Sequence, residues 1–160
     1  MKSLFLSLLL VFSMSAMAAS KGIDVTVNLS PAGSFHITSK KIKGKLKAKG
    51  KGYIGKEISI KVKSFKTGID LRDEHTKKRL SPKKHPKIIV TKVTAKGGKG
   101  KGVIKIKGTK KPFKFTYSVK GKLMMAEFKL NLKHFKLKDL TYLGVGAKDM
   151  VEIKANIPIK

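Results

Sequence analysis

A short cluster of ionisable side chains is the densest group in this sequence that could carry out chemistry. Its carboxylate and imidazole groups are ligands that metal ions accept, and they belong to Asp70, Asp73, Glu74 and His75. No second histidine follows at the spacing of a helical metal-binding motif. We therefore favour another interpretation, in which these acids form the first turn of a helix and are stabilised by its dipole and by the basic residues that follow.

Motifs of common catalytic sites are missing from the sequence. There is no nucleophile elbow, P-loop, dinucleotide fingerprint or paired-carboxylate motif, and the chain contains no cysteine. The stretch GGKGKG at 97–102 has the wrong spacing for a phosphate-binding loop, and a hairpin turn is the better interpretation. The remaining histidines, His36, His85 and His134, are isolated. We predict that the protein is not an enzyme and that it has no cofactor and no metal.

The elements that position these residues are predicted from an alternation of apolar residues and lysines. Residues 41–56 read KIKGKLKAKGKGYIGK, with lysines on one parity and, on the other, Ile42, Gly44, Leu46, Ala48 and Gly50. Successive side chains of a strand point to opposite faces of its sheet. The segment is therefore predicted to be a strand with one apolar face and one lysine face, because a disordered basic tail would show no such parity. A turn signal follows at Gly50 to Gly52.

The same alternation recurs along the chain and defines the fold class. It predicts strands within 23–29, 57–65, 103–108, 112–119, 124–133 and 150–159, and more weakly within 33–38 and 87–95. One-sided alternation favours antiparallel sheets. We predict an all-β protein, a closed antiparallel β-barrel of about eight strands, with one or two short helices in its connections. One helix is expected over 71–80, and at most one helical turn within 134–148.

Residues 1–18 are predicted to be a signal peptide. Lys2 precedes an apolar run from Leu4 to Phe12, and small residues follow at Ala16 and Ala18, as signal peptidase requires. The run is shorter than the ~20 residues that a bilayer-spanning helix needs. We expect an exported protein, in the periplasm of a Gram-negative bacterium, with secretion as the alternative.

Closure of the sheet would turn the inner side chains towards one apolar interior, which is either packed or hollow. Small inner residues leave room, namely Gly44, Ala48, Ala126 and Ala155. The residues expected to line a ligand cavity are Ile60, Val62, Ile104, Ile106, Phe113, Phe115, Tyr117, Phe128 and Leu130. Such a cavity suits a long hydrocarbon chain, and lysines at its mouth could hold a phosphate or carboxylate head group.

Several stretches of the sequence resemble the YceI-like family. They are SFKTGIDLRDEH at 64–75, HPKI at 85–88, GVIKIKGTKKPFKF at 102–115, and FKLNLKHFKL followed by DMVEIKANIPI. The resemblance covers 22–159 and implies a single lipocalin-like barrel domain in an exported bacterial protein. It also implies binding of a polyisoprenoid or similar amphiphilic lipid. The chain departs from the family in having no tryptophan, and in having His85 where a tyrosine is usual.

The strong positive charge suggests an alternative function. The chain has 38 basic and 9 acidic residues, a net charge of +29, and its only arginines are Arg72 and Arg79. Such a polycation attracts anionic polymers or membranes, including lipopolysaccharide and nucleic acid, and the barrel would then be only a scaffold. Specific nucleic-acid recognition is not expected, because sequence-specific readers favour arginine. We favour the lipid carrier, with weak electrostatic contacts to an anionic envelope; formation of a homodimer is left open.

Overall fold

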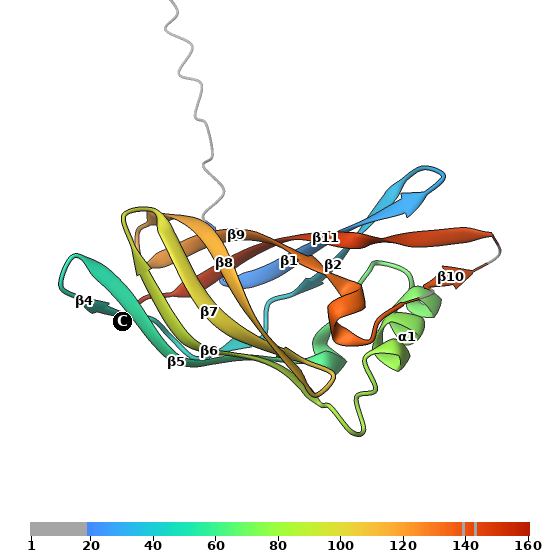
Figure 1. The fold of residues 1–160 in the computed structure, drawn as a ribbon, viewed down its shortest axis with the longest axis horizontal. Helices are drawn as coiled ribbons and strands as arrows, with labels where there is room; N and C mark the ends of the chain where they lie inside the picture. Colours follow the sequence, from blue (N-terminus) through green and yellow to red (C-terminus); the bar gives the residue numbers. More distant parts are fainter. Residues whose placement is uncertain (1–18, 139, 143) are drawn as a thin grey trace, which may run out of the picture.

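The computed structural model describes residues 19–138, 140–142 and 144–160. Antiparallel strands wrap into a nearly closed barrel, with one helix at one end (Figure 1). Neighbouring strands follow the order β2-β1-β11-β9-β8-β7-β6-β5-β3, with β10 beside β11 and β4 beside β5. The predicted all-β antiparallel barrel is confirmed. The signal peptide predicted at residues 1–18 lies outside the described residues.

The described part of the chain forms eleven strands and three short helices. The strands are β1 (Gly22–Ser30), β2 (Ser34–Ser39), β3 (Ile42–Lys43), β4 (Lys47–Lys49), β5 (Gly52–Lys61), β6 (Lys87–Lys96), β7 (Lys99–Ile106), β8 (Thr109–Lys120), β9 (Leu123–Asn131), β10 (Thr141–Tyr142) and β11 (Val145–Pro158). The helices are η1 (Val62–Ser64), α1 (Asp70–Arg79) and η2 (Leu132–Phe135). The helix predicted over 71–80 is therefore present, whereas the single turn expected within 134–148 begins two residues earlier.

Two backbone contacts bring the edges of the sheet together. Leu46 bridges Ile159 in parallel: its N–H donates to the Pro158 carbonyl (2.8 Å) and its own carbonyl accepts from the Lys160 N–H (2.8 Å). Thr38 forms an antiparallel bridge with Lys66, through hydrogen bonds of 2.8 and 2.9 Å. These contacts pair part of the edge that an open sheet would expose for aggregation.

The lysine-rich segment 41–56 contributes to three strands. The turn predicted at Gly50 to Gly52 is present, but the one strand predicted before it is divided into β3 and β4. Gly44 has a φ of +97°, and a side chain there would overlap the backbone of Glu57, so the chain breaks its strand conformation at this point. A turn at Gly50 then starts β5. The lysines of the segment are exposed, and Ile42 and Leu46 are buried, as the parity predicted. Ala48 is exposed rather than inner, because β4 and β5 form a hairpin that extends beyond the barrel (Figure 1).

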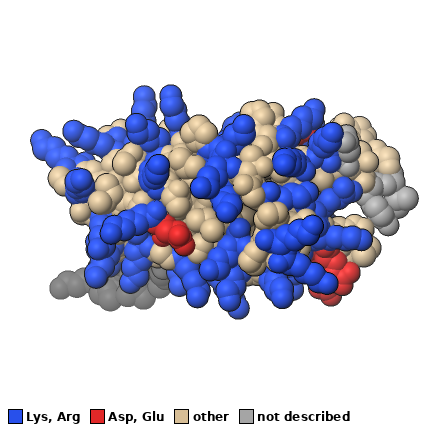
Figure 2. Space-filling view, turned by 60° about the horizontal axis from the view of Figure 1, so that its bottom comes forward, with Lys and Arg blue, Asp and Glu red and all other residues tan. Residues whose placement is uncertain are grey.

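Alternation in the long strands sorts apolar residues inward and charged residues outward. In β9, Met124, Ala126 and Leu130 are buried, whereas Lys129 points outward and pairs with Glu152 of β11 at 2.8 Å. Basic side chains cover the face shown in Figure 2 over its whole length, with acidic residues only in small patches. The outer surface therefore carries the charge, and the interior is apolar.

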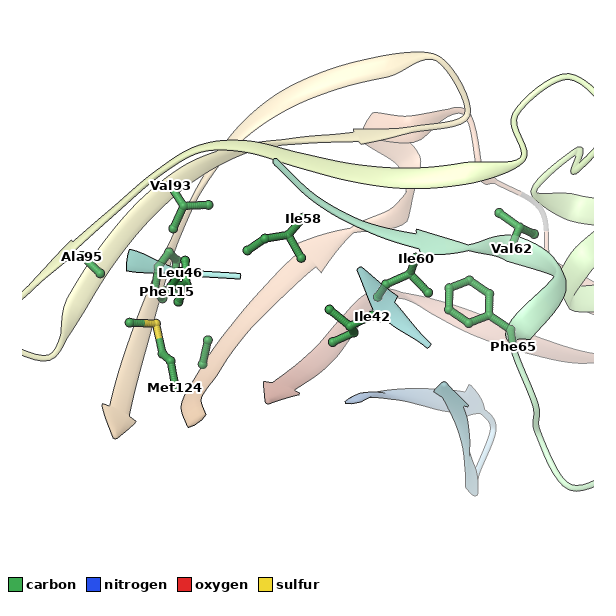
Figure 3. Close-up of a cluster of buried hydrophobic side chains, with 11 residues drawn as sticks. Ile42, Leu46, Ile58, Ile60, Val62, Phe65, Val93, Ala95, Phe115 and Met124 are labelled. Carbon is green, nitrogen blue, oxygen red and sulfur yellow. The ribbon is translucent and has the colours of Figure 1, made fainter. Parts of the chain in front are cut away.

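One end of the barrel, near β4, is filled by close-packed side chains. Leu46 and Met124 are 0% exposed, and with Ala95 and Phe115 they form what we call the packed end (Figure 3). The ring of Phe115 lies against Gly100, its partner on β7, where any side chain would overlap it. Burial of each large apolar side chain stabilises the fold by ~1.5–3 kcal/mol.

Candidate functional site

The rest of the barrel interior is hollow. A cavity of about 770 Å³ extends from the packed end to residues of the β1–β2 hairpin, of α1 and of the start of β11, and we call this second end the mouth. Its walls are overwhelmingly apolar side chains from the barrel strands. This volume lies within the roughly 300–1,000 Å³ of small-molecule sites. The interior is therefore both packed and hollow, in different parts of its length.

Seven of the nine residues that the sequence indicated lie on the cavity wall, namely Ile60, Ile104, Ile106, Phe113, Phe115, Phe128 and Leu130. Phe113 and Phe128 form a central aromatic pair with ring centroids 4.6 Å apart. The structure places the other two elsewhere. Val62 is 1% exposed in η1, where the alternation of β5 ends, and Tyr117 packs edge-on against Tyr53 with centroids 6.0 Å apart. Contact of any of the nine with a ligand stays a prediction.

Further wall residues come from β1 and β11, which pair with each other in the sheet. They are Ile23, Val25 and Val27 of β1 and Val151, Ile153 and Ala155 of β11. The alternation of these segments marks them as inner, so their position was available from the sequence. Ala126 also lines the cavity and lies opposite Ala155 in the β9–β11 ladder, which leaves the space that small inner residues predict.

One face of α1 forms a side of the mouth. Its cavity-lining residues are Arg72, His75, Thr76 and Arg79, whose spacing of three, four and seven residues places them on one side of a helix. The guanidinium of Arg72 lies 4.7 Å from the centroid of the Phe35 ring, an attractive cation–π contact. We expected lysines at the mouth, but no described residue of the cavity wall is a lysine.

Exposed apolar side chains surround the opening. Ile69 and Leu71 at the start of α1 are 50% and 55% exposed, and Val145 at the start of β11 is 41% exposed, yet all three line the cavity. The mouth is therefore an apolar rim set in a basic surface. No helix among the described residues is long and apolar enough to span a membrane.

The buried carboxylate of Asp73 holds α1 in place. It accepts hydrogen bonds from the Thr67 backbone N–H (2.5 Å) and hydroxyl (2.8 Å), and it pairs with the Lys66 ammonium at 3.1 Å. Burial acts to raise the pKa of Asp73, but these hydrogen bonds and charges outweigh it and lower the pKa to about 2. Asp70 and Asp73 lie in the first turn of α1, as the helix-terminus interpretation predicts. No group of three potential ligands that could hold a metal occurs among the described residues.

The fold and the cavity define a class of protein, small lipocalin-like β-barrels with one apolar interior cavity. Within this class, a family model for the YceI-like domain matches residues 13–159, and the chain therefore belongs to the YceI-like family. The resemblance seen in the sequence is confirmed. Comparison with curated proteins gave no match.

Several solved structures share the fold. BcnA from Burkholderia cenocepacia superposes with a TM-score of 0.63 at 18% identity, over 84% of this chain and 94% of BcnA. A polyisoprenoid-binding domain from Saccharophagus degradans, implicated in plant cell wall breakdown, gives a TM-score of 0.61 at 10% identity, over 86% of this chain and 91% of the domain. A mutant of CJ YceI made for nanotechnology applications gives 0.52 at 20% identity, over 75% and 83% of the two chains. At such low identities, the superpositions show similarity of fold alone.

Proposed function

We propose that this protein is a non-enzymatic carrier of a polyisoprenoid or similar amphiphilic lipid, which it holds in the barrel cavity. The observation that carries the proposal is the apolar cavity of about 770 Å³, open at one end. Membership of the YceI-like family and the similar fold of the Saccharophagus degradans polyisoprenoid-binding domain support the choice of ligand. The wall offers little polar chemistry beyond the mouth, which supports binding rather than catalysis.

Burial of a hydrocarbon chain supplies the free energy of binding. Each buried methylene contributes ~0.8 kcal/mol, so about ten of them give on the order of 8 kcal/mol before the costs of association. A long chain is needed because those costs consume several kcal/mol. The tail is expected to lie towards Phe115 and the head at the mouth beside α1.

We also propose that the protein is exported, to the periplasm or out of the cell. The basic residue, apolar run and small residues of the 1–18 segment support export. A lipid carrier is useful in such a compartment, because a long apolar chain is poorly soluble in the water between two membranes. Fractionation of cells, followed by N-terminal sequencing of the mature protein, tests this part of the proposal.

Filling the cavity tests the carrier function. Ala126→Leu places about three extra carbon atoms in the cavity, which leaves room for about three fewer methylene groups of the ligand. At ~0.8 kcal/mol for each methylene, we expect geranylgeraniol to bind about fiftyfold more weakly. Titration with geranylgeraniol, and native mass spectrometry of the protein with its co-purified lipid, measure this. Ala48→Leu makes the same change at an exposed site and should bind like the wild type.

Two further measurements separate blocked binding from damaged folding. Overpacking a core costs ~1–3 kcal/mol, so the free energy of unfolding of Ala126→Leu should be measured by urea denaturation alongside binding. Ala155→Leu fills the same space from the neighbouring strand and should weaken binding in the same way. Equal affinity of all three variants for geranylgeraniol, or no binding by the wild type, would contradict the proposed function.

A further inference from the structure

The two kinds of basic residue occupy different places in this molecule. Only two of the 38 basic residues are arginines, Arg72 and Arg79, and both line the cavity. None of the lysines among the described residues does so. Among the described residues, the basic side chains of the cavity lining with a permanent charge are therefore guanidinium groups, although lysine far outnumbers arginine in the sequence.

Helix α1 presents both arginines to the same opening. They lie seven residues apart, ~10.5 Å along the helix axis, on the face that also carries Thr76. Arg72 is half-buried and stacks on the Phe35 ring, which also lines the cavity, so its guanidinium is held at the wall. Arg79 is exposed and also lines the cavity, at the C-terminal end of α1.

The described residues that line the cavity include both arginines and no carboxylate. Neither Arg72 nor Arg79 forms an ion pair with a carboxylate of the described residues. Asp73, the buried acid of α1, is instead neutralised by Lys66 at 3.1 Å and Lys77 at 3.9 Å. Among the described residues, the cavity lining therefore carries positive charge and no negative charge.

We propose that Arg72 and Arg79 form a binding site for an anionic head group, and that the carried lipid bears a phosphate or carboxylate. A guanidinium donates two parallel hydrogen bonds to such an oxyanion, which an ammonium group cannot do. The position of the arginines also fits an amphiphile, because a lipid whose tail fills the apolar cavity would have its polar head at the mouth beside α1. This inference rests on the proposed function and specifies the class of lipid.

Ligands with one common chain and different heads test the inference. Geranylgeranyl diphosphate, geranylgeranoic acid and geranylgeraniol are titrated into the wild type at low and physiological salt. Hydrogen bonds to a charged group predict that at least one anionic ligand binds about tenfold or more tightly than the alcohol. The diphosphate and the acid distinguish a phosphate head from a carboxylate head.

Matched variants separate a built site from the general positive field of the protein. R72Q/R79Q should reduce the ratio of anionic to alcohol affinity at least about tenfold, and R72K/R79K should reduce it partly, because charge remains without the planar fork. K78Q/K83Q removes the same charge from exposed lysines that do not line the cavity, and should keep the wild-type ratio.

The possible outcomes distinguish the two proposals. If the wild type binds all three ligands equally, or if K78Q/K83Q lowers the ratio as much as R72Q/R79Q does, the head-group site is wrong while the lipid carrier stands. If none of the ligands binds, including the alcohol, the proposed function itself is wrong. Retention of the full ratio by R72Q/R79Q also overturns the inference.

Discussion

At the scale of single residues, Asp73 shows how one buried carboxylate holds the helix α1 against the barrel, although α1 is not part of the hydrogen-bonded sheet. Its carboxylate joins the loop at Thr67 to α1, and Lys66 compensates its charge. Removal of a buried, hydrogen-bonded charge leaves its partners unsatisfied, which is more costly than the net strength of the bonds suggests. Because α1 carries both arginines of the mouth, this residue also positions the site that we propose for the head group.

We expect substitutions of Asp73 to destabilise the protein in a graded way. Asp73→Ala removes every acceptor and should lower the free energy of unfolding by about 2–3 kcal/mol, whereas Asp73→Asn keeps an acceptor for Thr67 and should cost about 1 kcal/mol less. Urea denaturation near neutral pH measures both. Asp24→Asn is the control, since its pair with His36 is exposed and should contribute less than about 1 kcal/mol. Equal effects of the three substitutions would refute this role for Asp73.

The low pKa of Asp73 also predicts a dependence of stability on pH. The pKa is about 2 in the folded protein, against an ordinary value of 3.8, so the folded state favours the charged form. Its stabilisation is fully present above the ordinary pKa and is lost as the pH falls towards 2. The difference in melting temperature between wild type and Asp73→Asn should be constant above about pH 5 and shrink towards pH 2. A difference that does not change with pH would contradict the assignment.

At the scale of elements, the pairing of β7 with β8 depends on a glycine. Gly100 leaves the space that the ring of Phe115 occupies across the ladder. Gly102, two residues further on, has a similar relation to Phe113, but a side chain there would lie 3.1 Å from the ring, a far milder contact. These glycines therefore leave room for aromatic rings on the neighbouring strand of the same wall.

The contact between Gly100 and Phe115 can be tested by a double-mutant cycle. Gly100→Ala should cost about 1–3 kcal/mol of unfolding free energy, because the ring must move, and Gly102→Ala should cost less. The cost of Gly100→Ala should fall by about 1 kcal/mol in a Phe115→Leu background, where the smaller side chain leaves room for the methyl group. Strictly additive effects would show that the ring is not the cause.

The strand boundaries show what alternation can and cannot predict. The direction of the side chains at Ile42 and Leu46 followed from parity, because one face of the segment had to be buried. The turn at Gly50 followed from its glycines, but the break at Gly44 did not, because it depends on where the segment meets Glu57. A local pattern specifies which face is inner, whereas the end of a strand depends on a partner that is distant in sequence.

At the scale of the whole molecule, the excess of lysine predicts a general affinity for polyanions. The binding constant for single-stranded DNA or for anionic vesicles should fall steeply between about 50 and 200 mM salt, with a slope set by the number of lysines engaged. Ala126→Leu should leave this affinity unchanged, because it alters only the interior. Filter binding or vesicle sedimentation measures it. An affinity that does not depend on salt would mean that something other than charge is recognised.

Most of the barrel and much of its lining could be predicted from the sequence, because both follow from the two-residue period of strands. The mouth could not. Arg72 and Arg79 lie in a helix without a strong apolar pattern. The approach of Arg72 to Phe35 depends on contacts distant in sequence, namely the link between Thr67 and Asp73 and the bridge between Thr38 and Lys66. The division of the interior into hollow and packed parts was equally inaccessible, since it depends on side chains contributed by several strands.

The packed end has a consequence for how cargo would be exchanged. Because Leu46 and Met124 fill the far end of the described barrel, a lipid that enters through the mouth tail first would have to leave head first through the same doorway. A lipid donor and a lipid acceptor could then not exchange lipid with the protein at opposite ends of the barrel at the same time. Delivery by such a carrier would then take separate encounters, each with the doorway turned to a new surface, and its rate would be limited by release of the head group.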